Sequence, residues 1–257
     1  TGATHSYFGH EDWASTAPGL KTIEDAIEIR RRVLLAFELA ERRMLETGDH
    51  PPLNFVVVGG GPTGVELAGA ICDIARHYLR RDFRHIDPAQ ARVLLLEGGR
   101  RLLPSYPEAL SVKAEQQLAK LGAEIHNNTT VTDVQPGYVM AGGQRIDSVV
   151  TLWAAGVQAS PLGRMLAVAT DKRGCVYVNA TLNPEGHPEI FICGDLAHFE
   201  QEGKQVPGVA QPAMQMGDHV AKMIAADLNH QPRPGFRYMG AASSPTCPMA
   251  FKSASSW

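Results

Sequence analysis

Cysteine is scarce in this sequence of 257 residues, which contains only Cys72, Cys175, Cys193 and Cys247. No two of them form a C-x-x-C pair, and their spacing suggests no disulfide framework. We therefore expect idle thiols in a reducing compartment and a cytoplasmic location. The ten histidines show no metal-ligand spacing, so no metal site is expected.

Long apolar runs and an excess of positive charge are also missing. No run reaches the roughly 18 apolar residues that a membrane-spanning helix needs. The formal net charge of −3 gives no electrostatic basis for binding nucleic acid, which is excluded as a partner. With 44% hydrophobic and 20% charged residues, the composition is that of a globular protein.

The order of apolar segments predicts an α/β fold with a doubly wound, Rossmann-type domain. Three apolar runs bounded by turn residues predict buried parallel strands: 53–58, 91–97 and 149–154. Helices are expected at 64–80 and 107–121, between the strands. Short strands with turns at 123–146 predict an antiparallel meander inserted into this domain. Strand, Gly-rich turn, helix, strand, helix, strand is the order of a dinucleotide-binding unit.

Further elements are expected on both sides of this domain. Thr22 and Asp25 match a capping box, and the helix they open should end at Gly48. One expected face of that helix is apolar except for its glutamate: Ile23, Ile27, Leu34, Phe37, Glu41 and Met44. After the domain, short strands are expected at 176–178 and 190–193, and a helix at 210–228.

A G-x-G-x-x-G sequence follows the first predicted strand and comprises Gly59, Gly60, Gly61, Pro62, Thr63 and Gly64. Because it links a buried strand to a helix, it has the context that a dinucleotide fingerprint requires. Gly59 would permit the tight turn, Gly61 would let backbone approach a pyrophosphate, and Gly64 would let helix and strand pack closely. The helix N-terminus would then face the phosphates.

Two carboxylates accompany this loop. Glu97 ends the second strand, where it could bind both ribose hydroxyls of the adenosine half and repel a 2′-phosphate, which favours NADH over NADPH. Arg100 and Arg101 weaken that preference, and the alternative is a surface glutamate after a strand. Glu66 is expected in the first helical turn, where it either matches the helix dipole or lies near the nicotinamide and flavin rings. Both interpretations of Glu66 stay open.

At this point the sequence resembles a family. Residues 55–69 look like the NADH-binding signature of type II NADH dehydrogenases, which are single-subunit, non-proton-pumping members of the FAD-dependent pyridine nucleotide-disulfide oxidoreductase superfamily. Residues 191–195, Phe-Ile-Cys-Gly-Asp, are similar to the second FAD motif of that family. Residues 210–215 fit its A-Q-x-A-x-Q pattern, and residues 153–157 resemble the segment that closes the NADH domain. The resemblance covers roughly residues 1–239.

The resemblance implies FAD and NAD(H) as cofactors and a quinone as electron acceptor. Hydride would pass from NADH to the flavin, and two electrons would then pass to the quinone. Gln211 and Gln215, four residues apart on one helix face, would contact the quinone or the flavin edge. Without the family match, two such glutamines would be ordinary surface or cap residues.

Further binding residues are implied by the same resemblance. Asp195, after Gly194, would bind a ribitol hydroxyl of FAD. Ala210 would open a helix whose positive end stabilises the reduced flavin. Ala155 and Gly156 would leave room for the dinucleotide, although a strand end and a tight turn explain the same two residues.

The resemblance also divides the chain. Residues 1–50 would complete the first FAD-domain segment and its linking helix, 51–158 would be the NADH domain, 159–239 would be the second FAD segment with the quinone-site helix, and 240–257 would be an atypical tail. The first FAD loop of the family is absent, so we expect a fragment. Its full-length parent is expected to be dimeric and peripheral on the cytoplasmic face of a membrane.

Two alternatives remain beside the quinone reductase. One is a related FAD-dependent reductase of a disulfide or of an electron-transfer protein, which the missing cysteine pairs disfavour within this segment. The other is a truncated module that binds NADH and has no activity.

Overall fold

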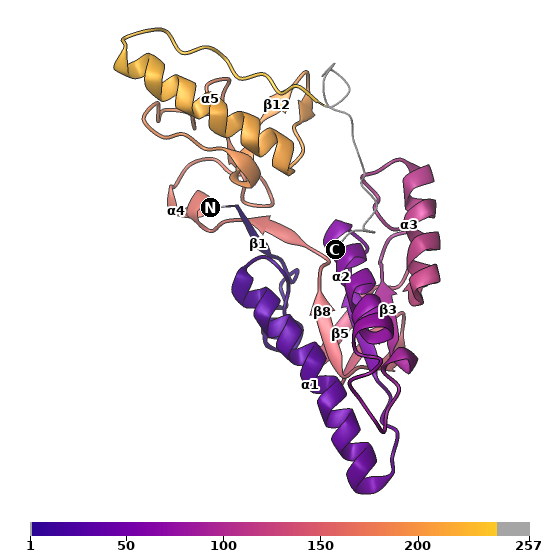
Figure 1. Ribbon diagram of the computed structural model, residues 1–257. Coiled ribbons are helices and arrows are strands. Elements are labelled where there is room, and N and C mark those ends of the chain that lie inside the picture. The colour runs from indigo at the N-terminus through magenta and orange to yellow at the C-terminus, as the bar shows by residue number, and fades with distance from the viewer. Residues whose placement is uncertain (1, 241–257) are drawn as a thin grey trace. The chain divides into compact units, whose positions relative to one another are not determined.

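The computed structural model describes residues 2–240 and divides into two compact units (Figure 1). The first unit comprises His5–Val157, and the second comprises residues 2–4 together with the chain from Gln158 onward. Residues 5–50 therefore pack with the segment that the sequence assigns to the NADH domain. The functional names given to the four sequence segments stay predictions. The tail from residue 241 lies outside the described residues.

A four-stranded parallel sheet is the centre of the first unit and confirms the doubly wound α/β prediction. Its strand order is β4 (Ala123–His126), β3 (Arg92–Leu96), β2 (Asn54–Val58) and β8 (Val150–Trp153). Every residue of β2 and β8 is buried, which explains why both segments read as continuous apolar runs. The register places Val58, the last residue of β2, beside Leu96 and Trp153. The carboxyl ends of the three strands therefore lie at one edge.

The strand β4 corrects the expected extent of the meander. Its sequence was expected to belong to the antiparallel insertion, but β4 pairs in parallel with β3. Gly122 ends the preceding helix with a φ of +90°, in the left-handed region, and returns the chain beside β3. The meander is limited to β5 (Val131–Gln135), β6 (Tyr138–Ala141) and β7 (Gln144–Asp147), which pair antiparallel.

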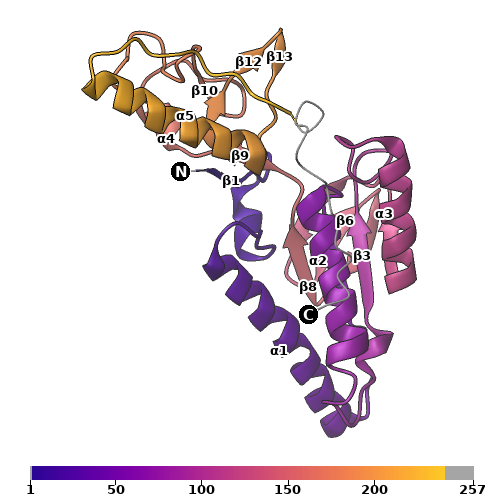
Figure 2. The ribbon, with the colours of Figure 1, turned by 45° about the horizontal axis from the view of Figure 1, so that its top comes forward.

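Helices and meander cover opposite faces of the parallel sheet. The helices α1 (Ile23–Thr47), α2 (Pro62–Asp73) and α3 (Glu108–Leu121) share one apolar core with Phe55, Val57 and Leu95. The alternate strand residues Val56 and Leu94 face the meander in a second core. Figure 2 shows α2 and α3 beside β3. The first unit thus has three layers with the sheet in the middle.

The helix α1 begins and ends where the sequence predicts, but its buried face differs. Thr22 and Asp25 form the capping box, and Gly48 is the left-handed C-cap. The residues of α1 that pack on the core share a three- and four-residue spacing: Ile29, Val33, Phe37 and Ala40. Ile23 and Ile27 are exposed by 74% and 62%. Two apolar stripes share Phe37, so periodicity alone could not select the buried one.

The helix after the Gly-rich loop also differs from its predicted bounds. It begins at Pro62, two residues earlier than expected. The helix was predicted to continue to residue 80, but α2 ends at Asp73 and is followed by a single π-helical turn, η2 (Ile74–Tyr78). A short 3₁₀ turn, η3 (Pro88–Gln90), precedes β3, and another, η1 (Glu11–Ser15), precedes α1.

The second unit is built around the predicted helix α5 (Ala210–Leu228), which begins and ends as expected. Its small strands are β10 (Val176–Tyr177), parallel to β11 (Ala197–His198), and the hairpin of β12 (Glu200–Gln201) with β13 (Lys204–Gln205). A short helix, α4 (Leu162–Met165), and a 3₁₀ turn, η4 (Gly194–Leu196), complete it. Leu182, Met216 and Phe236 share its apolar core. The strands β1 (Ala3–His5) and β9 (Val157–Ala159) pair as a separate two-stranded sheet.

The strand expected at 190–193 does not form. Ile192 N–H donates one hydrogen bond to the Leu182 carbonyl, at 2.9 Å, but no ladder of such bonds develops along the segment. The partner of β10 is instead β11, which follows η4. No helix between residues 2 and 240 combines the length and the apolarity needed to cross a membrane.

Candidate functional site

The Gly-rich loop between β2 and α2 has a geometry that limits side chains at some positions and leaves space at another. Gly59 has a φ of +106°, and a Cβ there would lie 2.5 Å from the Ala155 nitrogen. A Cβ on Gly64 would collide with the Gly59 carbonyl oxygen. Gly61, the N-cap of α2, has no atom within 4 Å of its would-be Cβ. The open N-terminus of α2 can therefore receive an anionic group.

Pro62 and Thr63 continue this loop as the first two residues of α2. Proline is favoured at the first helical position because its missing N–H would have no partner inside the helix. The backbone amides near Gly61 thus remain the donors available at this helix end.

Glu97 lies against the Gly-rich loop. One carboxylate oxygen, Oε2, accepts a hydrogen bond from the Gly60 N–H at 2.6 Å, and Oε1 accepts one from the Gly99 N–H at 2.6 Å. A carboxylate oxygen has two lone pairs, so each oxygen of Glu97 can accept a further hydrogen bond from a ligand hydroxyl. The structure therefore brings together the carboxylate and the loop that the sequence pattern predicts as a nucleotide site.

The two arginines beyond Glu97 have different surroundings. The Arg101 guanidinium donates to the carbonyls of Pro104 and Tyr106, at 2.9 Å each, and to Ser111 Oγ at 2.5 Å. It therefore stabilises the loop before α3 and is not directed at a ligand. Arg100 is exposed. Of the pair, only Arg100 has a side chain available to weaken the preference for NADH.

A cavity of about 300 Å³ lies at the carboxyl ends of β2, β3 and β8. Its lining includes Phe8, Gly59, Glu97, Thr130 and Ala155. A Cβ on the neighbouring Gly156 would lie 2.8 Å from Phe8 Cζ and 2.9 Å from the Ser6 carbonyl oxygen. Gly156 is thus held by close packing, while Ala155 faces the cavity.

A larger cavity, of about 690 Å³, lies beside α1 and residues 147–151. None of the predicted site residues lines it. The smaller cavity is the better candidate, because it adjoins the Gly-rich loop and the Glu97 carboxylate, which could orient a ligand.

Glu66 was predicted in the first turn of its helix but lies beyond it. Because α2 begins at Pro62, Glu66 is its fifth residue, and the first turn contains no acidic residue. A dipole-matched helix start therefore no longer explains Glu66. Its side chain is exposed.

In the second unit, the Gly194-Asp195 pair lies beside the start of α5. Gly194 has a φ of +70°, and a Cβ there would lie 3.4 Å from the Ala213 Cβ. A Cβ on Gly208, just before α5, would lie 3.5 Å from Asp195 Oδ1. Two motifs that are 15 residues apart in sequence, Asp195 and Ala210, thus meet at one helix N-terminus.

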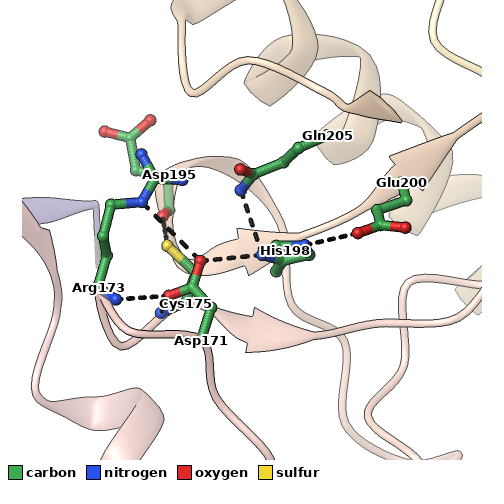
Figure 3. A network of polar contacts seen from close by, with 7 residues as sticks. All are labelled: Asp171, Arg173, Cys175, Asp195, His198, Glu200 and Gln205. Carbon is green, nitrogen blue, oxygen red and sulfur yellow. Dashed lines mark hydrogen bonds and ion pairs between the residues drawn. The ribbon is translucent and has the colours of Figure 1, made fainter. Parts of the chain in front are cut away.

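A polar network supports Asp195 (Figure 3). Cys175 Sγ donates to the Asp195 carbonyl at 3.4 Å, and the Cys175 N–H donates to Asp171 Oδ1 at 2.9 Å. Asp171 Oδ2 lies 2.9 Å from His198 Nδ1. Burial raises the pKa of Asp171, but hydrogen bonds from His198 and from the N–H groups of Cys175 and Arg173 hold that pKa below its usual value. This network could not be predicted from the sequence, because Asp171 and His198 are far apart in the chain and match no motif.

The two glutamines of the A-Q-x-A-x-Q pattern have different surroundings. Gln215 Nε2 donates to the Met239 carbonyl, and the Met239 N–H donates to Gln215 Oε1, both at 3.0 Å. Gln201 holds Tyr238 by a similar reciprocal pair. Gln211 is exposed at the start of α5. The amide of Gln215 is thus engaged with backbone, whereas Gln211 is open to a ligand.

The described cysteines are unpaired thiols. Cys72 and Cys175 are buried, and Cys193 is exposed. Burial raises the pKa of Cys72 to about 11, which keeps that thiol protonated and unreactive near neutral pH. Cys247 lies outside the described residues.

A Gly-rich loop at a parallel-strand edge, with a carboxylate on the adjacent strand, defines the class of dinucleotide-binding α/β proteins. The sequence profile of one family, the pyridine nucleotide-disulphide oxidoreductases, matches residues 1–217, and the chain belongs to this family.

Individual relatives have names that are more specific than that of the family. The chain is 43% identical to the type II NADH:quinone oxidoreductase Ndh of Mycobacterium tuberculosis, over 95% of this chain and 55% of that protein. It is 35% identical to the type II NADH:quinone oxidoreductase of Haemophilus influenzae, over 74% of this chain and 44% of that protein. The chain thus spans about half the length of these curated relatives.

A solved structure shares the fold. The structure of NDH2 from Plasmodium falciparum in complex with NADH superposes with a TM-score of 0.78 at 17% identity, covering 93% of this chain and 65% of that one. At this identity the likeness concerns the fold alone.

Proposed function

We propose that this chain is a large part of an FAD-dependent NADH:quinone oxidoreductase of the non-proton-pumping type. The observation that carries the proposal is the Glu97 carboxylate held against Gly60, beside the open position at Gly61. A dinucleotide placed there has its ribose hydroxyls at Glu97 and its pyrophosphate at the N-terminus of α2. NADH is the favoured nucleotide, because the carboxylate repels a 2′-phosphate.

The residues of the first unit fit NAD(H). Gly59, Gly60 and Gly64 allow close packing of the loop, and Gly61 leaves the space that a diphosphate needs. Ala155 lines the same cavity at the end of β8, where the nicotinamide half would reach. Pro62, Thr63 and Gly156 complete the surrounding backbone. Glu66, exposed on α2, is assigned to the region of the nicotinamide and flavin rings.

The residues of the second unit fit part of FAD. The Asp195 carboxylate, held by Gly194 beside the N-terminus of α5, can accept a ribitol hydroxyl, and Ala210 lies at that positive helix end. When bound, FAD supplies the redox chemistry that takes hydride from NADH and gives two electrons to a quinone. Gln211 is the residue assigned to contact the quinone carbonyl, and Gln215 acts beside it by holding Met239.

The whole protein is proposed to be a dimer that binds peripherally to the cytoplasmic face of a membrane. The support for the membrane is chemical, since the relatives are named for a quinone and quinones partition into lipid. The dimer and the cytoplasmic face rest on the family resemblance of the sequence. Residues 1–50 and 159–239 are assigned to the FAD domain of that protein, and residues 51–158 to its NADH domain.

Calorimetric titration of the purified chain with NADH tests the nucleotide site directly. We expect saturable binding, and no heat of binding from folded protein would overturn the proposal. Addition of FAD should then give a flavin absorbance that NADH bleaches and a quinone analogue restores. Restoration only by a disulfide or by an electron-transfer protein would favour the related reductases. Binding of NADH without FAD retention would identify an inactive NADH-binding module.

A further inference from the structure

Phe8 occupies a backbone position that phenylalanine disfavours. The turn of residues 7–10 is closed by a hydrogen bond from the His10 N–H to the Tyr7 carbonyl, at 3.1 Å. Phe8 and Gly9 have φ angles of +54° and +94°, so both central residues lie in the left-handed region, as in a type I′ turn. Asn, Asp or Gly is favoured at the first central position, whereas a bulky residue there is strained.

Burial does not explain the choice of phenylalanine. The Phe8 side chain is 68% exposed, whereas the preceding Tyr7 is 4% exposed. Tyr7 anchors the turn by stacking on Trp153, with ring centroids 5.3 Å apart, and by donating to the Ala17 carbonyl at 2.9 Å. Phe8 makes an edge contact with Trp153 at 6.4 Å. Tyr7 therefore holds the turn in place, and packing inside the protein does not account for the exposed ring of Phe8.

The ring of Phe8 forms one wall of the 300 Å³ cavity described above. Its tip packs so closely on Gly156 that a Cβ there would lie 2.8 Å from Phe8 Cζ. This places the ring at the end of β8, while Glu97 lies at the end of β3 on the other side of β2. A dinucleotide bound at this edge lies across the strand ends. If its adenosine ribose lies at Glu97, its nicotinamide half reaches the end of β8.

We propose that Phe8 is a binding residue for the nicotinamide half of NADH, with its ring packed against the nicotinamide ring. This inference rests on the proposed function, because it takes Glu97 as the adenosine end. Strained residues persist where the surrounding structure fixes them, and they concentrate at ligand sites. An exposed aromatic ring beside an apolar cavity wall gains its contact area when a planar ligand covers it.

Titration of the full 257-residue chain with NADH and, separately, with ADP-ribose tests the assignment. ADP-ribose keeps the adenosine, pyrophosphate and second ribose but lacks the nicotinamide. We expect Phe8→Asn to weaken NADH binding about three- to tenfold and to leave ADP-ribose binding within about twofold, as loss of one aromatic contact predicts. Asparagine suits the left-handed turn position, so the thermal midpoint should stay equal or rise. Phe8→Tyr should keep NADH affinity within about twofold.

Matched variants make each outcome decisive. Tyr78→Asn removes another exposed aromatic ring, 69% exposed and outside the cavity, and should leave both affinities unchanged. Unchanged NADH affinity in Phe8→Asn would overturn the role of Phe8 and leave the proposed function standing. Equal loss of both ligands would also overturn it, because the ring would then support the pocket as a whole. Absence of binding of either ligand to the unmodified chain would overturn the proposed function itself. Phe8→Gly replaces Phe8→Asn should the latter fail to fold.

Discussion

The Glu97 carboxylate accepts a hydrogen bond from the Gly60 backbone N–H at 2.6 Å, which ties the end of β3 to the loop after β2. The strand register makes this contact reachable, because Leu96 pairs directly with Val58. Glu97 is thereby oriented before any ligand arrives. A preoriented acceptor loses less conformational freedom on binding, which favours affinity.

Replacing this carboxylate tests whether it binds ribose. We expect Glu97→Ala to weaken NADH binding about ten- to a hundredfold, since charge-assisted hydrogen bonds contribute about 1.5–3 kcal/mol each. Calorimetry measures the loss, and circular dichroism checks that the loop variant remains folded. Glu124→Ala removes a carboxylate of β4 that is paired with Arg92 and His126, away from the Gly-rich loop, and should leave NADH affinity unchanged. Equal effects of both variants would contradict a specific role of Glu97.

Two glycines of the loop should respond in opposite ways to alanine. Gly61 has a φ of −72° and open space around its would-be Cβ, so Gly61→Ala should fold normally but obstruct the pyrophosphate. We expect at least a tenfold loss of NADH affinity, about 1.4 kcal/mol, with an unchanged unfolding midpoint. Gly64→Ala would drive a Cβ into the Gly59 carbonyl and should destabilise the fold by about 1–3 kcal/mol. Full NADH affinity in Gly61→Ala would show that the ligand does not cross this position.

The two glutamines of α5 should separate in a similar comparison. Gln215→Ala removes both hydrogen bonds to Met239, so the Met239 amide should exchange with solvent at least about tenfold faster. Gln211→Ala should leave that amide unchanged. On the proposed function, Gln211→Ala is expected to slow quinone reduction more than flavin reduction in stopped-flow measurements of the FAD-containing enzyme. Unchanged exchange in Gln215→Ala would show that the amide pair does not hold this segment in solution.

Much of the fold could be predicted because local signals were strong. The runs that became β2 and β8 are mostly apolar and are buried on both faces. The loop after β2 combines a glycine with a positive φ, Gly59, with the start of a helix. The buried face of α1 could not be predicted, because two apolar stripes compete and only the sheet selects between them. The position of β4 depends on pairing with β3, which the sequence pattern does not encode.

The candidate site could also be predicted only in part. Glu97 was found because it ends a strand beside a recognisable loop. The engagement of Gln215 with Met239 was missed, since a hydrogen bond to backbone 24 residues away leaves no pattern in sequence. Phe8 was missed for a related reason, because its importance lies in a φ angle and in its proximity to Gly156.

The hydrogen bonds of Glu41 predict that the first unit loses stability in acid. Its carboxylate accepts hydrogen bonds from the N–H groups of Arg84, His85 and Ile86, at 3.0 to 3.1 Å, and contacts the His85 ring at 2.8 Å. Burial raises the pKa of Glu41, but these hydrogen bonds lower it from 4.5 to about 2. Because the folded-state pKa lies below the unfolded one, the stabilisation is complete above about pH 4.5 and is lost as the pH falls toward 2.

We expect Glu41→Gln to cost about 1–3 kcal/mol at pH 7 and progressively less at lower pH, measured by urea unfolding. Glu38→Gln, at an exposed position of the same helix, should show no such difference. A cost for Glu41→Gln that stays constant from pH 7 to 3 would show that the loop does not depend on the charge of this carboxylate.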